Sequence, residues 1–160
     1  MQVEHPVTEM VTGHDLVSLQ LGLASGAKIA DLTQENIVAK GHAIECRIYA
    51  ENPDKMFLPS PGELKTLKMP ATSASVRVDI GVSEGDKVTP YYDPMIAKLI
   101  CHGDTREAAL SQMAEALNEV SIDGIANNVN FLKRVITHKQ FSDGDVFTGF
   151  IDVNKEQLIG

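Results

Sequence analysis

The sequence has 160 residues, of which 43% are hydrophobic and 22% are charged, as expected for a globular protein of one domain, or of one domain plus part of another. Its formal net charge is −8, so there is no basic excess to neutralise phosphates, and nucleic acid is excluded as the main partner. No run approaches the roughly 20 apolar residues of a membrane span, and the start of the sequence lacks a secretory signal pattern, so no membrane partner is expected.

The two cysteines, Cys46 and Cys101, lie within apolar runs typical of strands. This placement predicts two buried thiols in a reducing compartment rather than a disulfide. There is no CxxC motif and no paired Cys/His spacing, so we predict no metal site in this chain.

The first stretch that could carry chemistry is Gln2-Val3-Glu4-His5-Pro6, which groups an amide, a carboxylate and an imidazole. Gln2-Val3-Glu4 alternates as a strand does, and Pro6 prevents the strand from continuing. Strand ends that open into a cleft often carry catalytic groups in α/β folds. By spacing alone, an ordinary polar connection between a strand and a helix is the favoured interpretation of this stretch.

Two helical segments are predicted next. Residues 7–11 can form one turn, and Asp15 can cap a helix over about 16–25. The apolar residues of this helix fall near helical spacing at Val17, Leu21 and Leu23. Residues 27–40 lack a clear period and form a connection, in which we expect a domain boundary near residue 38.

The clearest strand of the sequence covers residues 43–51. One face is apolar and comprises Ile44, Cys46, Ile48 and Ala50. The other face comprises Glu45, Arg47, Tyr49 and Glu51. Arg47 is therefore either balanced by a neighbouring glutamate on its own face or aimed into a cleft to hold an anion.

The middle of the chain is rich in turns. Two prolines and a glycine make residues 57–62 a rigid turn rather than a strand or helix. Short strands are predicted further along, over residues 63–68, 76–80, 87–90 and 95–101. Several short strands with Gly/Pro turns indicate a small β-barrel or sandwich.

The period then changes to that of helices. Asp104 or Thr105 can cap a helix that runs to about residue 118, and Asn127 or Asn128 can cap a second one, with a short strand or link over 120–123 between them. Strands followed by helices make this region an α+β unit.

Several motifs, in this order, resemble the biotin carboxylase family over nearly the whole chain. They are residues 2–9, 41–51, 57–62, 91–100, 123–128 and 148–151. The resemblance implies that residues 1–38 form the end of an ATP-grasp domain and that residues 39–152 form a biotin carboxylase C-terminal domain. That domain is a β-barrel-like hybrid with flanking helices, and residues 153–160 would be a tail.

The resemblance also implies site residues. Glu4 corresponds to the general base that deprotonates bicarbonate, and Gln2 and the backbone of Val3 correspond to positions that hold bicarbonate. Arg47 corresponds to the arginine that stabilises the enolate-like anion of biotin. The reaction uses ATP, bicarbonate and Mg²⁺ or Mn²⁺, and it carboxylates biotin held on a carrier domain.

The implied partners are the preceding biotin carboxylase domains, the biotin carboxyl carrier domain and a carboxyltransferase subunit. A homodimer is also implied, with Val76 and Arg77 at its interface. The implied location is the cytoplasm, or the mitochondrial matrix in a eukaryote. The parent would be a propionyl-, acetyl- or methylcrotonyl-CoA carboxylase, a choice that this region is not expected to determine.

The chain also departs from the family. It begins at Met1 and lacks the Glu, Asn and Arg expected just before Gln2, as well as the glycine-rich lid and the lysines that bind ATP. We therefore expect a piece of a biotin carboxylase that is inactive alone. Two alternatives stay open: a non-catalytic module that dimerises or binds a partner, and another ATP-grasp carboxylate ligase, which the motifs at 57–62 and 91–100 count against. His5 could orient Glu4 or serve as a structural, hydrogen-bonded histidine.

Overall fold

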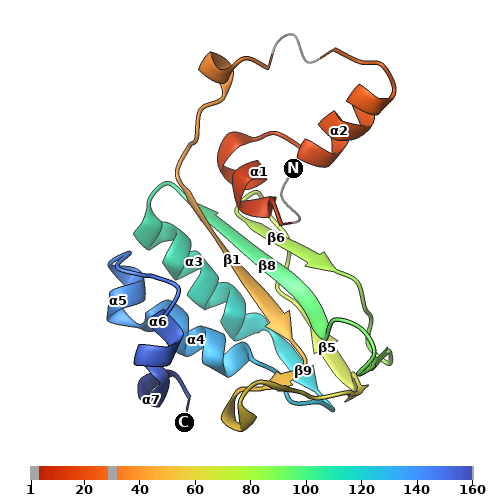
Figure 1. Cartoon of the computed structure of the whole chain (residues 1–160), viewed down its shortest axis with the longest axis vertical. Helices are drawn as coiled ribbons and strands as arrows, with labels where there is room; N and C mark the ends of the chain where they lie inside the picture. The colour runs from red at the N-terminus through yellow and green to blue at the C-terminus, as the bar shows by residue number, and fades with distance from the viewer. Residues whose placement is uncertain (1–3, 29–31, 160) are drawn as a thin grey trace.

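The computed structural model describes residues 4–28 and 32–159 and shows a mixed α+β fold (Figure 1). Its helices are α1 (Pro6–Thr12), α2 (Leu16–Ala24), α3 (Arg106–Glu119), α4 (Val129–Thr137), α5 (Lys139–Ser142), α6 (Phe150–Val153) and α7 (Lys155–Leu158), with 3₁₀ turns η1 (Gln34–Asn36) and η2 (Pro53–Lys55). Its strands are β1 (His42–Tyr49), β2 (Glu51–Asn52), β3 (Leu58–Pro59), β4 (Gly62–Glu63), β5 (Thr66–Lys68), β6 (Val76–Ile80), β7 (Lys87–Val88), β8 (Met95–Gly103) and β9 (Ser121–Asp123).

The centre of the fold is an antiparallel three-stranded sheet in the order β1-β8-β6. Leu99 of β8 lies opposite Cys46 on one side and Val78 on the other. Paired residues of an antiparallel sheet share a face, and successive residues alternate between faces. The sheet therefore has one face that carries Cys46 and Leu99 and a second face that carries their sequence neighbours.

Helix α3 packs against β8 and β1 and covers the apolar face. Thr105 begins this helix by accepting a hydrogen bond from the amide of Ala108 at 3.2 Å. Met113 and Leu117 on α3 and Leu99 on the sheet are all fully buried. The predicted helix, its cap and its apolar stripe are thus confirmed.

Three short two-stranded ladders surround the sheet: β2-β3, β4-β7 and β5-β9. The expectation that residues 57–62 contain no strand is wrong, because Leu58–Pro59 pairs with Glu51–Asn52. A proline removes only its own N–H, and the next residue, Ser60, donates to the carbonyl of Ala50 at 2.7 Å. In the turn before β3, Met56 and Phe57 have φ values of 54° and 57°. This left-handed conformation is uncommon for residues other than glycine.

The C-terminal helices enclose a second, smaller core made of Phe131, Val135, Phe150 and Leu158. Arg134 holds the end of the chain by donating from Nε to the carbonyl of Leu158 at 2.6 Å. The residues after 152 complete α6 and form α7, and Leu158 of α7 is fully buried.

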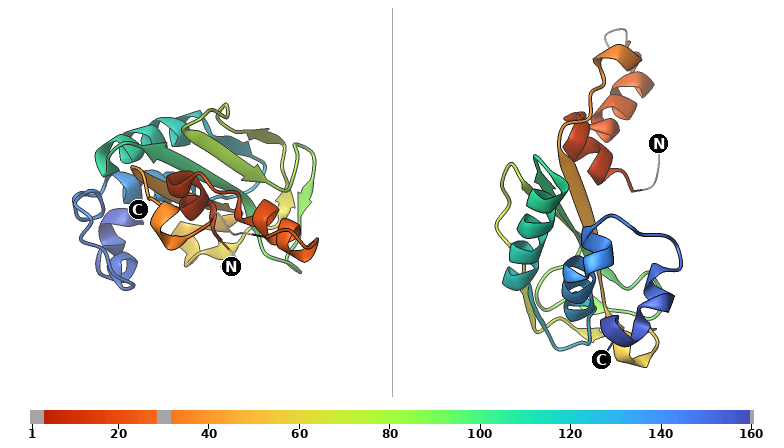
Figure 2. Two further views of the ribbon diagram at one scale, coloured as in Figure 1. Left: turned by 90° about the horizontal axis from the view of Figure 1, so that it is seen from above. Right: turned by 90° about the vertical axis from the view of Figure 1, so that its left-hand side faces the viewer.

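The N-terminal helices follow the predicted local signals. Gly13 ends α1 with φ 72°, and Asp15 caps α2 by accepting from the amide of Ser18 at 2.8 Å. Figure 2 shows α2 extending away from the sheet. No residue of α2 is buried, and its apolar side chains at Val17, Leu21 and Leu23 are exposed within the described structure. No helix in the described part of the chain is long and apolar enough to cross a membrane.

Candidate functional site

The second face of the central sheet is charged. Arg47, Lys98 and Asp79 lie opposite one another across β1, β8 and β6. In the adjacent row, Ile100 lies between Glu45 and Arg77. Each of these five charged side chains forms an ion pair with a neighbour on the sheet, on α1 or just before α1, and the longest of these contacts, Glu45–Arg47 and Asp79–Lys98, are 3.8 Å.

Helix α1 covers this charged face, since it packs against β1 and β8. Ile100 is fully buried even though both of its cross-strand neighbours are charged, and it does not belong to the main core. Pro6 at the start of α1 is also fully buried. The charged face is therefore the floor of a contact with α1, rather than an open surface.

The structure brings Glu4 and Arg47 together. Glu4 Oε2 forms an ion pair with Arg47 Nη2, and the side chain of Glu4 is 18% exposed while that of Arg47 is 50% exposed. The other carboxylate oxygen, Glu4 Oε1, is buried and has no hydrogen-bond partner among the described residues. Burying a carboxylate oxygen without a hydrogen-bond donor costs free energy. Oε1 of Glu4 is therefore placed to accept a hydrogen bond or a proton from a further group.

Glu45 lies beside this pair, with its Oε1 3.8 Å from Arg47 Nε and only 12% of its side chain exposed. Burial raises the pKa of Glu45, and the positive charge of Lys98 opposes that shift. Arg47 is thus flanked by two carboxylates, one on its own strand and one on the segment before α1.

The backbone of β1 at Arg47 is fixed by a side chain from another element. Asn128 is the only buried polar or charged residue in the described chain. Its Nδ2 donates to the carbonyl of Arg47 at 3.1 Å, and its Oδ1 accepts from the amide of Tyr49 at 2.9 Å. Asn128 is the N-cap position of α4, but its side chain makes no cap bond there; Asn127 instead accepts from the amide of Val129 at 3.2 Å.

Arg77 on β6 is bound on two sides. Asp79 accepts from its Nε at 2.7 Å and its Nη2 at 2.9 Å, and Glu9 of α1 accepts from its Nη1 at 2.7 Å. The hydrogen bond to Asp79 raises the pKa of Arg77 most, and the bond to Glu9 adds to it. Val76 is buried in the chain's own core. A role for Val76 and Arg77 between subunits stays a prediction.

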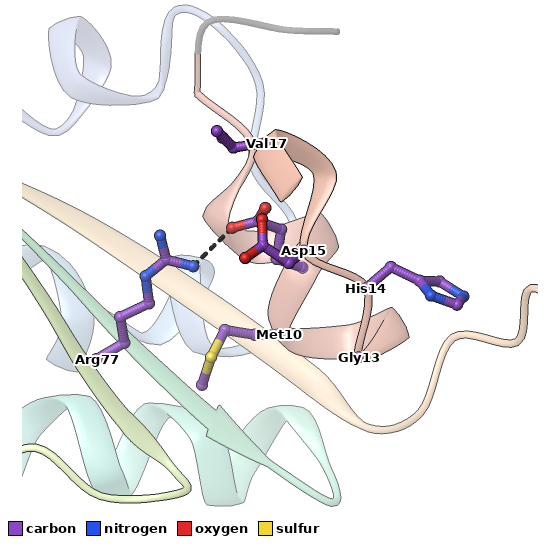
Figure 3. Close-up of a pocket in the computed structure, with 7 residues that line it drawn as sticks. Met10, Gly13, His14, Asp15, Val17 and Arg77 are labelled. Atoms are coloured by element: carbon purple, nitrogen blue, oxygen red, sulfur yellow. Dashed lines mark hydrogen bonds and ion pairs between the residues drawn. The ribbon is translucent and has the colours of Figure 1, made fainter. Parts of the chain in front are cut away.

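A cleft of about 430 Å³ lies where α1, the start of α2 and β6 meet. Figure 3 shows Arg77 reaching from β6 toward α1, with a dashed line marking its bond to the carboxylate of Glu9. Neither Glu4 nor Arg47 lines this cleft. Its lining residues are Glu9, Met10, Gly13, His14, Asp15, Val17 and Arg77.

Three other positions were predicted to take part in the site: Gln2, Val3 and His5. Gln2 and Val3 lie outside the described residues. His5 Nε2 lies 3.6 Å from Oε1 of Glu9, a carboxylate of α1. Within residues 4–28 and 32–159, no group of three or more His, Cys, Asp or Glu side chains could hold a metal ion.

Sequence reasoning missed three residues that shape the site: Glu9, Asp79 and Asn128. The alternation of Val76-Arg77-Val78-Asp79-Ile80 puts Arg77 and Asp79 on one face and could have revealed their pairing. Nothing local marks the contacts of Glu9 or Asn128, because their partners lie 68 and 79 to 81 positions away.

The chain matches two family models. Residues 45–153 match the biotin carboxylase C-terminal domain, and residues 1–32 match the ATP binding domain of the carbamoyl-phosphate synthase L chain. The longer match covers more than half of the chain.

Among known proteins, the chain is 48% identical over 159 residues to the mitochondrial methylcrotonoyl-CoA carboxylase subunit alpha of Dictyostelium discoideum, covering 99% of this chain and 23% of that protein. It is 47% identical over 152 residues to biotin carboxylase 1 of Bacillus subtilis, covering 95% of this chain and 33% of that protein. The chain thus spans about a quarter to a third of these relatives.

A solved structure has the same fold. The biotin carboxylase domain dimer of Hydrogenobacter thermophilus 2-oxoglutarate carboxylase, in complex with MgADP, ADP and bicarbonate, superposes with a TM-score of 0.95 at 38% identity, over 100% of this chain and 35% of that one. A pyruvate carboxylase from Rhizobium etli also matches, with a TM-score of 0.92 at 37% identity, over 100% of this chain and 16% of that one.

Proposed function

Because this chain belongs to the biotin carboxylase C-terminal domain family, we propose that it supplies one wall of a site where biotin is carboxylated with bicarbonate and ATP. In this proposal Glu4 is the general base toward bicarbonate, and Arg47 stabilises the negative charge that develops on the ureido oxygen of biotin. Gln2 and the backbone of Val3 would hold bicarbonate.

The observation that carries the proposal is the environment of Glu4. One of its carboxylate oxygens is bound to Arg47, and the other is buried without a partner among the described residues. A hydroxyl of bicarbonate is a donor of the right kind for that oxygen, and a carboxylate within about 3 Å of it can take its proton.

Arg47 suits the second role because half of its side chain remains exposed beside the ion pair. Its guanidinium has five donors, so binding Glu4 leaves others for a second anion. A fixed cation aimed at an oxygen that gains negative charge lowers the barrier to that step. Asn128 supports this by holding the Arg47 carbonyl in place.

The described residues offer no cluster of three or more His, Cys, Asp or Glu side chains for the metal that accompanies ATP. We therefore derive no step through the nucleotide from this chain. We propose that residues 1–38 belong to an ATP-grasp domain whose remaining parts bind ATP with Mg²⁺ or Mn²⁺, residues 39–152 to the C-terminal domain, and 153–160 to a tail. The exposed apolar residues of α2 support the first assignment, because an amphipathic or apolar helix normally buries such side chains against a partner.

The proposed partners are the preceding biotin carboxylase domains, a biotin carboxyl carrier domain, a carboxyltransferase subunit and a second copy of the chain, with Val76 and Arg77 near the dimer contact. The cytoplasm or the mitochondrial matrix is the proposed location. The final acceptor of the carboxyl group is not set by these residues, because relatives named for different acceptors match the chain over most of its length.

The test uses a chimera in which this chain replaces the corresponding third of the Bacillus subtilis biotin carboxylase 1. Phosphate release that depends on both biotin and bicarbonate is measured. We expect Glu4→Gln and Arg47→Ala each to lower the rate by at least about 100-fold.

The matched control is Asp143→Asn, which breaks the exposed ion pair of Asp143 with Lys139 far from the site. That variant should keep the rate of the unmodified chimera. If Glu4→Gln or Arg47→Ala retains near-normal turnover, the assignment is wrong. A chimera that folds and dimerises but releases no phosphate would favour the non-catalytic module.

A further inference from the structure

We propose that Glu9 is a positioning residue, which binds Arg77 and thereby holds α1 across the charged face so that Glu4 meets Arg47. This inference rests on the proposed function, since the position of Glu4 matters for turnover only if Glu4 and Arg47 act on the substrates.

Both carboxylate oxygens of Glu9 are used. Oε2 accepts from Arg77 Nη1 at 2.7 Å, and Oε1 accepts from the backbone amide of Leu16 at 2.7 Å. Only 9% of the Glu9 side chain is exposed. A carboxylate this buried is costly unless it is paired, so α1 is favoured in the one position where Glu9 reaches both donors.

Arg77 is prepared for this contact by its own strand. Asp79 lies two residues further along β6, on the same face, and binds Nε and Nη2 of the guanidinium side by side. This leaves Nη1 directed at α1, as Figure 3 shows. A bidentate arginine–carboxylate pair restricts the guanidinium more than a single contact does, so the anchor for Glu9 is rigid.

The segment from Glu4 to Glu9 is bound at its two ends to the two outer strands of the sheet. Glu4 binds Arg47 on β1, Glu9 binds Arg77 on β6, and β8 lies between these strands. Two strand spacings amount to about 10 Å. The three helical steps from Pro6 to Glu9 rise about 4.5 Å, and Glu4 and His5, which precede the helix, add up to about 3.3 Å each. The segment from Glu4 to Glu9 is thus long enough, with its side chains, to span the sheet.

Two ion pairs with the sheet restrict the orientation of α1 more than one ion pair does. Without the Glu9–Arg77 pair, α1 would still be held by its packing on β1 and β8 and by the Glu4–Arg47 pair, whereas the contact with β6 also fixes its direction. Glu9 also ties this direction to the residues just before α1, because its amide donates to the carbonyl of His5 at 3.1 Å. His5 directly follows Glu4, so a shift of Glu9 is passed on to the base.

The experiment replaces Glu9 by glutamine in the chimera. Glutamine keeps the length and an acceptor for Leu16 but loses the charge that binds Arg77. We expect kcat to fall by about tenfold or more, since a displacement near 1 Å of a reacting group has effects of this size. The KM for ATP should stay within about twofold, because the proposal gives neither Glu9 nor Arg77 a role in binding the nucleotide.

Arg77→Met removes the same contact from the other side and should lower kcat similarly. The double variant should then be little worse than either single one, because residues that act as a pair are not additive. Asp143→Asn again serves as the control. A loss of stability alone would reduce the amount of active enzyme without this selective, non-additive effect on kcat.

Hydrogen exchange on the 160-residue chain provides a readout that needs no activity. We expect amides of α1 to exchange faster in Glu9→Gln and in Arg77→Met, while amides of α3 keep their protection. Unchanged protection of α1 in both variants would overturn the inference.

The outcomes separate the two proposals. If Glu4→Gln abolishes turnover while Glu9→Gln keeps kcat within about twofold, the positioning role is wrong and the proposed function stands. If Glu4→Gln has no effect, the proposed function fails, whatever exchange shows about Glu9.

Discussion

The two faces of the β1-β8-β6 sheet are built from the same three strands and yet are held in different ways. One face packs against α3 through fully buried apolar side chains such as Leu99 and Met113. The other face is tied to α1 through the ion pair of Arg77 with Glu9 and to the residues before α1 through the ion pair of Arg47 with Glu4. Apolar burial is non-directional, whereas a buried ion pair needs one geometry.

The two faces therefore contribute differently to the stability of the fold and to the placement of α1. Burial on the α3 face supplies free energy that tolerates small shifts, while the α1 face contributes less net energy but specifies where a helix lies. A chain that must hold Glu4 at a defined point on the sheet gains from having both kinds of contact.

The largest effect on stability is expected on the α3 face. Leu99→Ala removes a side chain that is fully buried between the sheet and α3. It should lower the free energy of unfolding by about 2–5 kcal/mol, because it leaves a cavity in a packed core. Urea unfolding followed by circular dichroism measures the change. A loss well under 1 kcal/mol would mean that this face is not the main source of stability.

A smaller loss is expected from Asn128→Ala, which acts at the edge of β1. The substitution leaves the carbonyl of Arg47 and the amide of Tyr49 without their side-chain partner. Such unsatisfied groups cost about 1–3 kcal/mol, measured by the same unfolding curves. Asn130→Ala, two residues further along on the exposed side of α4, is the matched control and should change little.

The smallest expected effect is the reactivity of the two cysteine thiols on the apolar face. Burial raises the pKa of Cys46 and of Cys101 to about 12 in each case. At pH 8 only roughly one thiol in 10,000 is then ionised, so neither should react with a thiol reagent until the chain is unfolded. Fast labelling of either cysteine in the folded chain would show that this face opens readily.

The same shift has a consequence for pH. Unfolded thiols ionise near their ordinary pKa of 9.0, whereas the folded ones stay protonated up to about 12. The folded state therefore binds more protons in this window, and stability should fall as the pH rises from about 9 toward 12.

Local signals predicted much of the fold. The alternation of β1 placed Arg47 and Cys46 on the correct faces, and Asp15 and Thr105 were recognised as helix caps, because each of these features depends on residues close together in sequence. The ladder at Leu58–Pro59 was missed because its partner strand had no recognisable pattern of its own over two residues.

The site was less accessible to local reasoning. Pairing Glu4 with Arg47 required the family resemblance, since spacing alone left Glu4 in an ordinary polar connection. The contacts of Glu9 and Asn128 carried no local signal, because their roles depend on register and on contacts far along the chain. Long-range pairing is the information that propensity and periodicity do not contain.

The contacts of Asn128 also bear on self-association. β1 is an outer strand of its sheet, and the unpaired amides and carbonyls of such a strand are a template on which another chain can add and start aggregation. Asn128 occupies this template at Arg47 and Tyr49 with its side chain, and its backbone amide donates to the Tyr49 carbonyl at 3.2 Å. A single asparagine thus takes the place of a missing neighbour strand and keeps foreign strands from the part of β1 that carries Arg47.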